Sequence, residues 1–258
     1  MGRPFAFGRA CVERSGHERS IRTWRVRFRT VPRALQPRRP RGPRRPTRDR
    51  SLPRDVVDDV RRTARPGRAE EALSRLARAV ALLDRGNPVQ AAREAERAKE
   101  AAARSGAVRE VLALAYYGAE RWRDALREAQ TYRRVTGRAD QNHIIADCYR
   151  ALGNPEKAVA PAEEALRARV PDEVKAEAVI VAASALADMG RFDQALAMLR
   201  RLRTPPDVGR AHDLRVWYVL GDVLARAGRP EEAAREFRRV LRYDRTAFDA
   251  AERLAELP

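Results

Sequence analysis

The chain has 258 residues, of which 44% are hydrophobic, 54 are Lys or Arg and 36 are Asp or Glu. It is long enough to fold as one large or two ordinary domains with a hydrophobic core. No run approaches the ~18 consecutive apolar residues of a membrane helix, and the N-terminus lacks the apolar stretch of a signal peptide, so we expect a cytoplasmic protein without a membrane span. Cys11 and Cys148 are the only cysteines, which excludes a disulfide framework and a Cys-rich zinc site.

Positive charge is concentrated near the N-terminus. Residues 1–68 hold 21 Arg and 6 acidic residues, a net charge of +15, whereas residues 69–258 hold 33 basic and 30 acidic residues. Only Lys99, Lys157 and Lys175 are Lys, and this preference for Arg, together with abundant Ala, indicates the codon bias of a GC-rich bacterial genome. Arginine density is therefore weak evidence for nucleic-acid binding.

Residues 1–50 are predicted to form a disordered basic arm. Prolines recur through this segment and the residues between them are mostly Arg, so it lacks the apolar mass of a folded element. Within the arm, residues 37–48 are expected to be extended. Their arginines are the candidate contacts of an alternative functional hypothesis, a nucleic-acid- or ribosome-associated protein: Arg38, Arg39, Arg41, Arg44, Arg45 and Arg48.

Residues 21–29 alternate three apolar side chains, Trp24, Val26 and Phe28, with arginines. Three explanations fit this pattern: stacking on bases with neutralisation of phosphates, a strand that pairs only on binding, or an over-extended gene start that leaves residues 1–30 outside the native protein. The pattern alone does not choose among them.

Residues 51–68 are predicted to form a short helix and a linker. Pro53 suits the first turn of a helix, and Val56, Val57 and Val60 form a small apolar stripe. The turn at 66–67, Pro followed by Gly, ends the segment.

From Glu70 onward, apolar residues recur with a helical period, and an internal repeat is present. A turn residue is followed five positions later by Ala in five copies: Gly86/Ala91, Glu120/Ala125, Gly153/Ala158, Gly190/Ala195 and Gly228/Ala233. The helix before each turn also offers a small residue, which lets two helices approach closely: Ala79, Ala113, Ala146, Ala183 and Gly221. The pattern predicts five helix-turn-helix units that stack to bury their apolar faces.

These units resemble tetratricopeptide repeats over residues 69–245. The last unit carries the resemblance best, with the spacing Trp217-x2-Leu220-Gly221-x2-Leu224-x3-Gly228-x4-Ala233-x3-Phe237. The resemblance implies an all-α fold, a right-handed α-solenoid of about five units. Residues 246–258 are predicted to form a capping helix, in which one set of side chains covers the last repeat and Asp249, Glu252 and Glu256 face water; the covering set is Ala247, Phe248, Ala251, Leu254 and Ala255.

We find no sequence pattern for catalysis, a cofactor or a metal site. His17, His143 and His212 lack metal-ligand spacing, and no nucleophile elbow or phosphate-binding loop is present. Cys148 is interpreted as a buried core residue. Trp122 and Trp217 fall at repeat positions where packing explains them. We therefore expect a protein that is not an enzyme.

The resemblance implies a non-enzymatic scaffold that binds a peptide or helix along the concave surface lined by the first helix of each unit. Acidic residues outnumber basic ones six to three among the groove candidates, so the expected partner is a protein segment that carries Arg or Lys, with the arm itself as one option in cis. The opposite interpretation, that these charges only solvate helix faces, is also open. The candidates, all expected to be exposed, are Glu110, Tyr117, Asp140, His143, Asp147, Arg150, Glu177, Asp188, Arg215, Tyr218, Asp222 and Arg226.

The arm and the repeats should differ in protease sensitivity. Limited proteolysis of the full chain is expected to remove about the first 50–65 residues and leave a helical core, because the arm lacks apolar mass and the repeats share their cores. Mass spectrometry of the fragments locates the cut, which should fall before Glu70. A resistant fragment that retains residues 37–48 without any partner would contradict this boundary.

Overall fold

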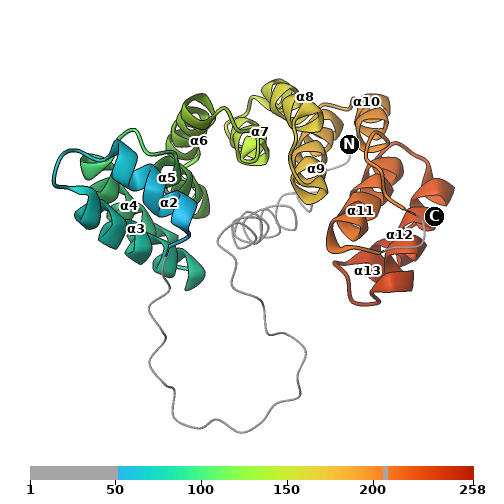
Figure 1. Ribbon diagram of the computed structural model, residues 1–258. Coiled ribbons are helices and arrows are strands. Elements are labelled where there is room, and N and C mark those ends of the chain that lie inside the picture. The colour runs from blue at the N-terminus through green and yellow to red at the C-terminus, as the bar shows by residue number, and fades with distance from the viewer. Residues whose placement is uncertain (1–51, 206–208) are drawn as a thin grey trace, which may run out of the picture. The chain divides into compact units, whose positions relative to one another are not determined.

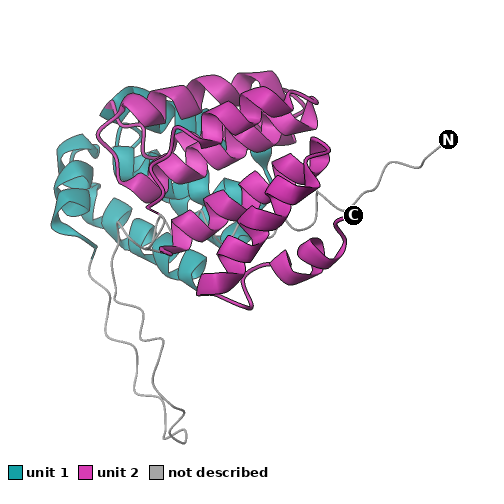
Figure 2. Cartoon of the chain, turned by 90° about the vertical axis from the view of Figure 1, so that its right-hand side faces the viewer, with its two compact units in different colours: residues 1–136 teal, residues 137–258 magenta. Residues whose placement is uncertain are grey.

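A computed structural model describes residues 52–205 and 209–258. Within these residues the secondary structure is entirely helical, as the sequence predicts. The chain divides into two compact units, residues 1–136 and residues 137–258, coloured separately in Figure 2.

The described part of the first unit contains one short helix and two helical hairpins (Figure 1). The helices are α2 (Arg54–Thr63), α3 (Ala69–Asp84), α4 (Pro88–Ala101), α5 (Gly106–Gly118) and α6 (Trp122–Thr136). Helix α3 pairs with α4, and α5 pairs with α6.

The predicted short helix, α2, is attached to the second hairpin. Its Asp59 carboxylate accepts hydrogen bonds from the Ser105 hydroxyl at 2.6 Å and from the Ala107 amide at 3.1 Å, at the first turn of α5. Val56 and Val60 are buried. Because a carboxylate is stabilised at the positive end of a helix, α2 both caps α5 and covers apolar surface.

The second unit contains three further pairs and a terminal helix. They are α7 (Asn142–Ala151) with the 3-10 turn η1 (Pro155–Ala158) and α8 (Val159–Arg167); α9 (Asp172–Asp188) with α10 (Phe192–Leu199); α11 (Ala211–Arg226) with α12 (Pro230–Tyr243); and α13 (Ala250–Ala255). The α8 helix is preceded by a 3-10 turn because Pro161 has no amide hydrogen to donate to the preceding turn.

The capping helix is shorter than predicted. It spans only Ala250–Ala255. Phe248 adopts a left-handed backbone conformation, with φ of 57°, so a helix cannot run through this residue and α13 begins after it. Ala250 is buried and Leu254 packs on the core of the second unit. Ala251 and Ala255, which were expected to cover the last repeat, are exposed instead.

The predicted register of the repeats is confirmed. The five alanines of the second helices are all fully buried, and so are the small residues of the first helices. Gly221 shows the constraint most directly, because a Cβ added there would lie 2.7 Å from the Phe237 ring. All five turn residues adopt positive φ, including Glu120, whose φ is 59°. Glu120 therefore takes a backbone conformation that ordinarily favours glycine, and repeat 2 keeps the same turn as the others.

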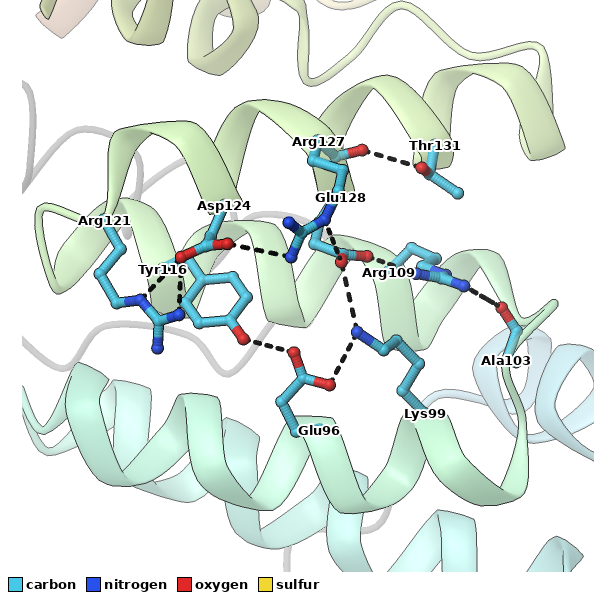
Figure 3. Close-up of polar contacts among 10 residues, drawn as sticks. All are labelled: Glu96, Lys99, Ala103, Arg109, Tyr116, Arg121, Asp124, Arg127, Glu128 and Thr131. Carbon is cyan, nitrogen blue, oxygen red and sulfur yellow. Dashed lines mark hydrogen bonds and ion pairs between the residues drawn. The ribbon is translucent and has the colours of Figure 1, made fainter. Parts of the chain in front are cut away.

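A buried carboxylate connects the two hairpins of the first unit (Figure 3). Glu128 on α6 lies 3.3 Å from Lys99 Nζ on α4 and 2.5 Å from Arg109 Nη1 on α5, with Arg127 Nε at 3.4 Å. Its side chain is 1% exposed. The Arg109 guanidinium also donates to the Ala103 carbonyl at 2.9 and 2.7 Å, which fixes the turn between α4 and α5. A buried carboxylate of this kind is stable only because several cations surround it.

Tyr116 extends the same network. Its hydroxyl donates to the Glu96 carboxylate, which lies 2.7 Å from Lys99 Nζ, and the Arg121 guanidinium lies 4.2 Å from the centre of the tyrosine ring. Burial, and then the hydrogen bond to Glu96, raise the pKa of Tyr116. The phenol therefore stays protonated and donates its hydrogen bond to Glu96.

Replacing Gly221 with alanine should destabilise the second unit by roughly 1–3 kcal/mol, because the added methyl group overlaps the Phe237 ring. Urea unfolding followed by circular dichroism measures the change. In the Phe237→Leu background the same substitution should cost less, because the smaller side chain leaves room for the methyl group. Equal costs in both backgrounds would contradict the proposed contact.

Candidate functional site

Ten of the twelve predicted groove residues lie in the second unit, on α7, α9 and α11 or just before α7, and the first helices of neighbouring repeats contact each other there. Glu110 and Tyr117 lie on α5, in the first unit. We refer to the part of α7, α9 and α11 that carries Asp147, Arg150, Glu177, Asp188, Arg215, Asp222 and Arg226 as the ion-pair face.

Five of the twelve candidates are buried, and the prediction that all are exposed is wrong. They are Glu110, Tyr117, Asp140, His143 and Glu177. The physical reason is packing on several sides: α5 contacts α2, α3, α4 and α6, and α9 contacts α7, α8, α10 and α11. Sequence periodicity shows which residues share a helix face but not how many neighbours cover that face.

Three charged residues form a ladder across the three repeats of the second unit. Asp188 on α9 accepts a hydrogen bond from Arg150 Nε of α7 at 2.9 Å through one carboxylate oxygen, and one from Arg226 Nη2 of α11 at 3.2 Å through the other. Each arginine is separated from Asp188 by 38 residues, about one repeat. One carboxylate thus bridges the ends of three first helices.

The remaining acids of the face are paired as well. Asp222 lies 3.7 Å from Arg226 and 2.6 Å from Arg253 of α13, and Asp147 lies 3.5 Å from Arg150. At the other end of the helices, Glu177 of α9 forms an ion pair with Arg215 of α11, and Asp140 lies 2.8 Å from Arg138. Arg138 and Arg253 were not among the candidates. When these two arginines are counted, the acidic candidates of the second unit no longer outnumber the basic residues around them.

His143 is buried on α7, with the Asp140 backbone beside its ring. Burial lowers the pKa of the imidazole, although the carboxylates of Glu177, Asp140 and Asp147 favour the charged form. Arg215 Nε and Asn142 Oδ1 are buried as well, and Asn142 Nδ2 donates to the Pro161 carbonyl at 2.9 Å. Because the surrounding protein encloses these groups, they do not contact a ligand at the surface.

Tyr218 joins the site to the terminal helix. Its hydroxyl donates to Asp249, and its ring lies 4.8 Å from the Phe248 ring and 5.8 Å from the Phe237 ring. Asp249 was expected to face water, but it is half-buried and acts as an acceptor. Phe248 packs on Tyr218 while remaining 42% exposed.

Cys148 lies on α7 and is buried. Burial raises the pKa of the Cys148 thiol well above its ordinary value, in keeping with its interpretation as a core residue. Among residues 52–205 and 209–258, no cluster of His, Cys, Asp and Glu has the geometry of a metal site, and no helix there is both long and apolar enough to cross a bilayer. The nucleic-acid candidates Arg38, Arg39, Arg41, Arg44, Arg45 and Arg48, together with residues 21–29, lie outside the described part of the chain.

The fold and the face define a helical repeat protein built from paired helices. Tetratricopeptide-repeat family models match residues 145–252 and residues 72–97. The chain therefore belongs to the tetratricopeptide-repeat family.

Solved structures agree with this assignment at the level of the fold. TTC0263, a thermophilic TPR protein of Thermus thermophilus, is 20% identical with a TM-score of 0.53, over 71% of this chain and 97% of that one. YrrB, described as a TPR protein with an unusual peptide-binding site, is 16% identical with a TM-score of 0.51, over 70% of this chain and 90% of that one. No curated protein sequence matches the chain.

The buried imidazole should make stability depend on pH. Because the pKa of His143 is lower in the folded state than the ordinary value of about 6.5, the unfolded state takes up the proton first, and stability is lost as the pH falls below that value. Urea unfolding at pH 7.5 and pH 5.5 is expected to show a smaller loss for His143→Gln than for the unchanged chain. Equal losses would contradict the buried neutral imidazole.

Proposed function

We propose that this protein is a non-enzymatic protein-interaction scaffold that binds a peptide or helix along the ion-pair face. The observation that carries the proposal is the ladder of Arg150, Asp188 and Arg226, which spans three first helices and in which Asp188 and Arg226 are exposed. A ligand offers both hydrogen-bond donors and acceptors, so it can bind the accessible carboxylate and guanidinium groups of this ladder.

The ladder of ion pairs also supports the proposal through its rigidity. Arg150, Asp188 and Arg226 hold one another across three helices, so their side chains lose little conformational freedom when a ligand arrives. Membership of the tetratricopeptide-repeat family and the likeness to YrrB, which carries a peptide-binding site, are consistent with a role in protein recognition.

The proposal assigns the binding surface of this protein, but it does not assign a charge to the partner. The expectation of an Arg- or Lys-bearing ligand rested on an acidic excess, and the ion pairs balance that excess within the second unit. Recognition would then depend on backbone hydrogen bonding and on contact with Tyr218 rather than on net charge.

A random peptide library selected against the full chain, followed by fluorescence anisotropy of the selected peptides, tests the proposal. Asp188→Asn and the paired change Arg150→Met with Arg226→Met remove the charged groups of the ladder while nearly conserving side-chain volume, and each is expected to weaken binding by about tenfold or more. Asp188 is exposed, so the paired change does not leave its carboxylate buried without a partner.

The control is Arg191→Met, which changes an exposed arginine before α10 and should leave affinity unchanged. Urea unfolding of each variant separates a loss of binding from a loss of fold. Selected peptides whose affinity is the same for all four proteins would contradict the assigned face.

A further inference from the structure

A cavity of about 260 Å³ lies in the second unit between the end of α10, α11 and α12. Four leucines contribute its apolar lining: Leu199, Leu202, Leu220 and Leu224. Leu202 and Leu220 are only partly buried, so apolar surface is accessible there. The cavity has room for one aliphatic or aromatic side chain.

Basic side chains surround this opening. Arg200, Arg235 and Arg239 line it, and Arg238 and Arg242 continue the exposed stripe of α12 that begins at Arg235, at helical spacings of three and seven residues. In the described part of the chain, no carboxylate lies within ion-pair distance of Arg200, Arg238 or Arg242, and Arg235 has a long contact of 3.9 Å with Glu232. Arg200 interacts with Glu232 and Glu236 only at longer range, and so does Arg235 with Glu236. This differs from the ion-pair face, where every arginine has a close carboxylate.

Arg239 is held in place before any ligand arrives. Its guanidinium lies 3.9 Å from the centre of the buried Trp217 ring, and it donates to the Thr204 carbonyl at 3.5 Å. Stacking on an aromatic face leaves the edge of the guanidinium able to donate to an anion.

The two acids of the cavity oppose an anionic ligand only weakly. Glu232 lies 2.5 Å from Arg229, which compensates its charge. Glu236 lies 3.8 Å from Arg239, and burial raises the pKa of its carboxyl group, so it takes up a proton more readily than an exposed glutamate when a second anion approaches.

We propose that this cavity is a second docking site, separate from the ion-pair face, for an acidic peptide segment that inserts one large apolar side chain among the leucines and places its carboxylates against Arg200, Arg235 and Arg239. The charge around the opening selects acidic flanks, and the apolar lining selects the anchor. A nucleic acid fits less well, because the lining presents no aromatic face on which a base can stack and its two glutamates face the phosphates.

Fluorescence anisotropy with the full chain tests this site. The probe is the labelled peptide Glu-Glu-Asp-Leu-Phe-Asp-Glu-Glu, with a second peptide in which Leu and Phe are both Ser. We expect the first peptide to bind, and both the Ser peptide and the double variant Arg200→Glu with Arg235→Glu to weaken binding by about tenfold or more. Both arginines are exposed, so the fold should tolerate these changes.

The matched control is Arg123→Glu with Arg134→Glu, two exposed arginines of α6 that do not line the cavity and whose reversal changes the net charge by the same amount. This control should bind the peptide like the unchanged chain. Three results would overturn the proposal: no binding of the acidic peptide, equal weakening in the control, or tighter binding of a single-stranded RNA that is lost in the Arg200→Glu/Arg235→Glu variant. None of these bears on the ion-pair face, because the altered side chains lie on other parts of the chain.

Discussion

Close approach of two helices within each repeat is the constraint on which the rest of the structure depends. Gly221 shows how little room there is, since a single methyl group at this position would overlap the Phe237 ring. The alanines at the corresponding places are fully buried for the same reason. The turn between the helices must also reverse the chain in a few residues, and each repeat achieves this with one left-handed residue. Glu120 adopts that conformation although it is not glycine, which indicates that helix packing outweighs the local backbone cost of roughly 1–2 kcal/mol.

Once the helices are paired, charged side chains connect one repeat to the next. In the first unit, Glu128 is buried among cations from three helices. In the second unit, Asp188 bridges Arg150 and Arg226 near the surface. Both arrangements use carboxylates to join cationic groups, but they differ in consequence. Breaking the buried network would leave a charge in an apolar environment, whereas the surface ladder is accessible to a ligand that replaces one of its contacts.

The two proposed sites in the second unit differ in how their charges are balanced. On the ion-pair face, Arg215 and Arg226 face carboxylates from neighbouring helices, so a ligand there must rely on hydrogen bonding and shape. Around the cavity between α10 and α12, Arg200 lies outside ion-pair distance of Glu232 and Glu236, and the three lining arginines outnumber these two glutamates. A chain with near-neutral repeats can therefore still carry an excess of positive charge around one opening.

The sequence by itself determined the all-α class, the five phased repeats and the identity of the contact residues. These follow from short-range periodicity and from the small residues at Ala91, Ala125, Ala158, Ala195 and Ala233, because helix spacing depends directly on side-chain size. The sequence also identified the residues that the ladder uses, since Arg150, Asp188 and Arg226 were all groove candidates.

Only the tertiary structure decided which charges meet and which residues are covered. The burial of Glu110 and Glu177, the pairing of Arg253 with Asp222 and the shortened α13 all depend on contacts between helices distant in sequence. The cavity between α10 and α12 likewise has no signature in any single repeat, because Arg200 and Arg239 come from different repeats. Periodicity shows on which face of a helix a side chain lies. The partner of that side chain is set by packing between repeats, because the repeat length varies along the chain and charges from neighbouring helices meet there.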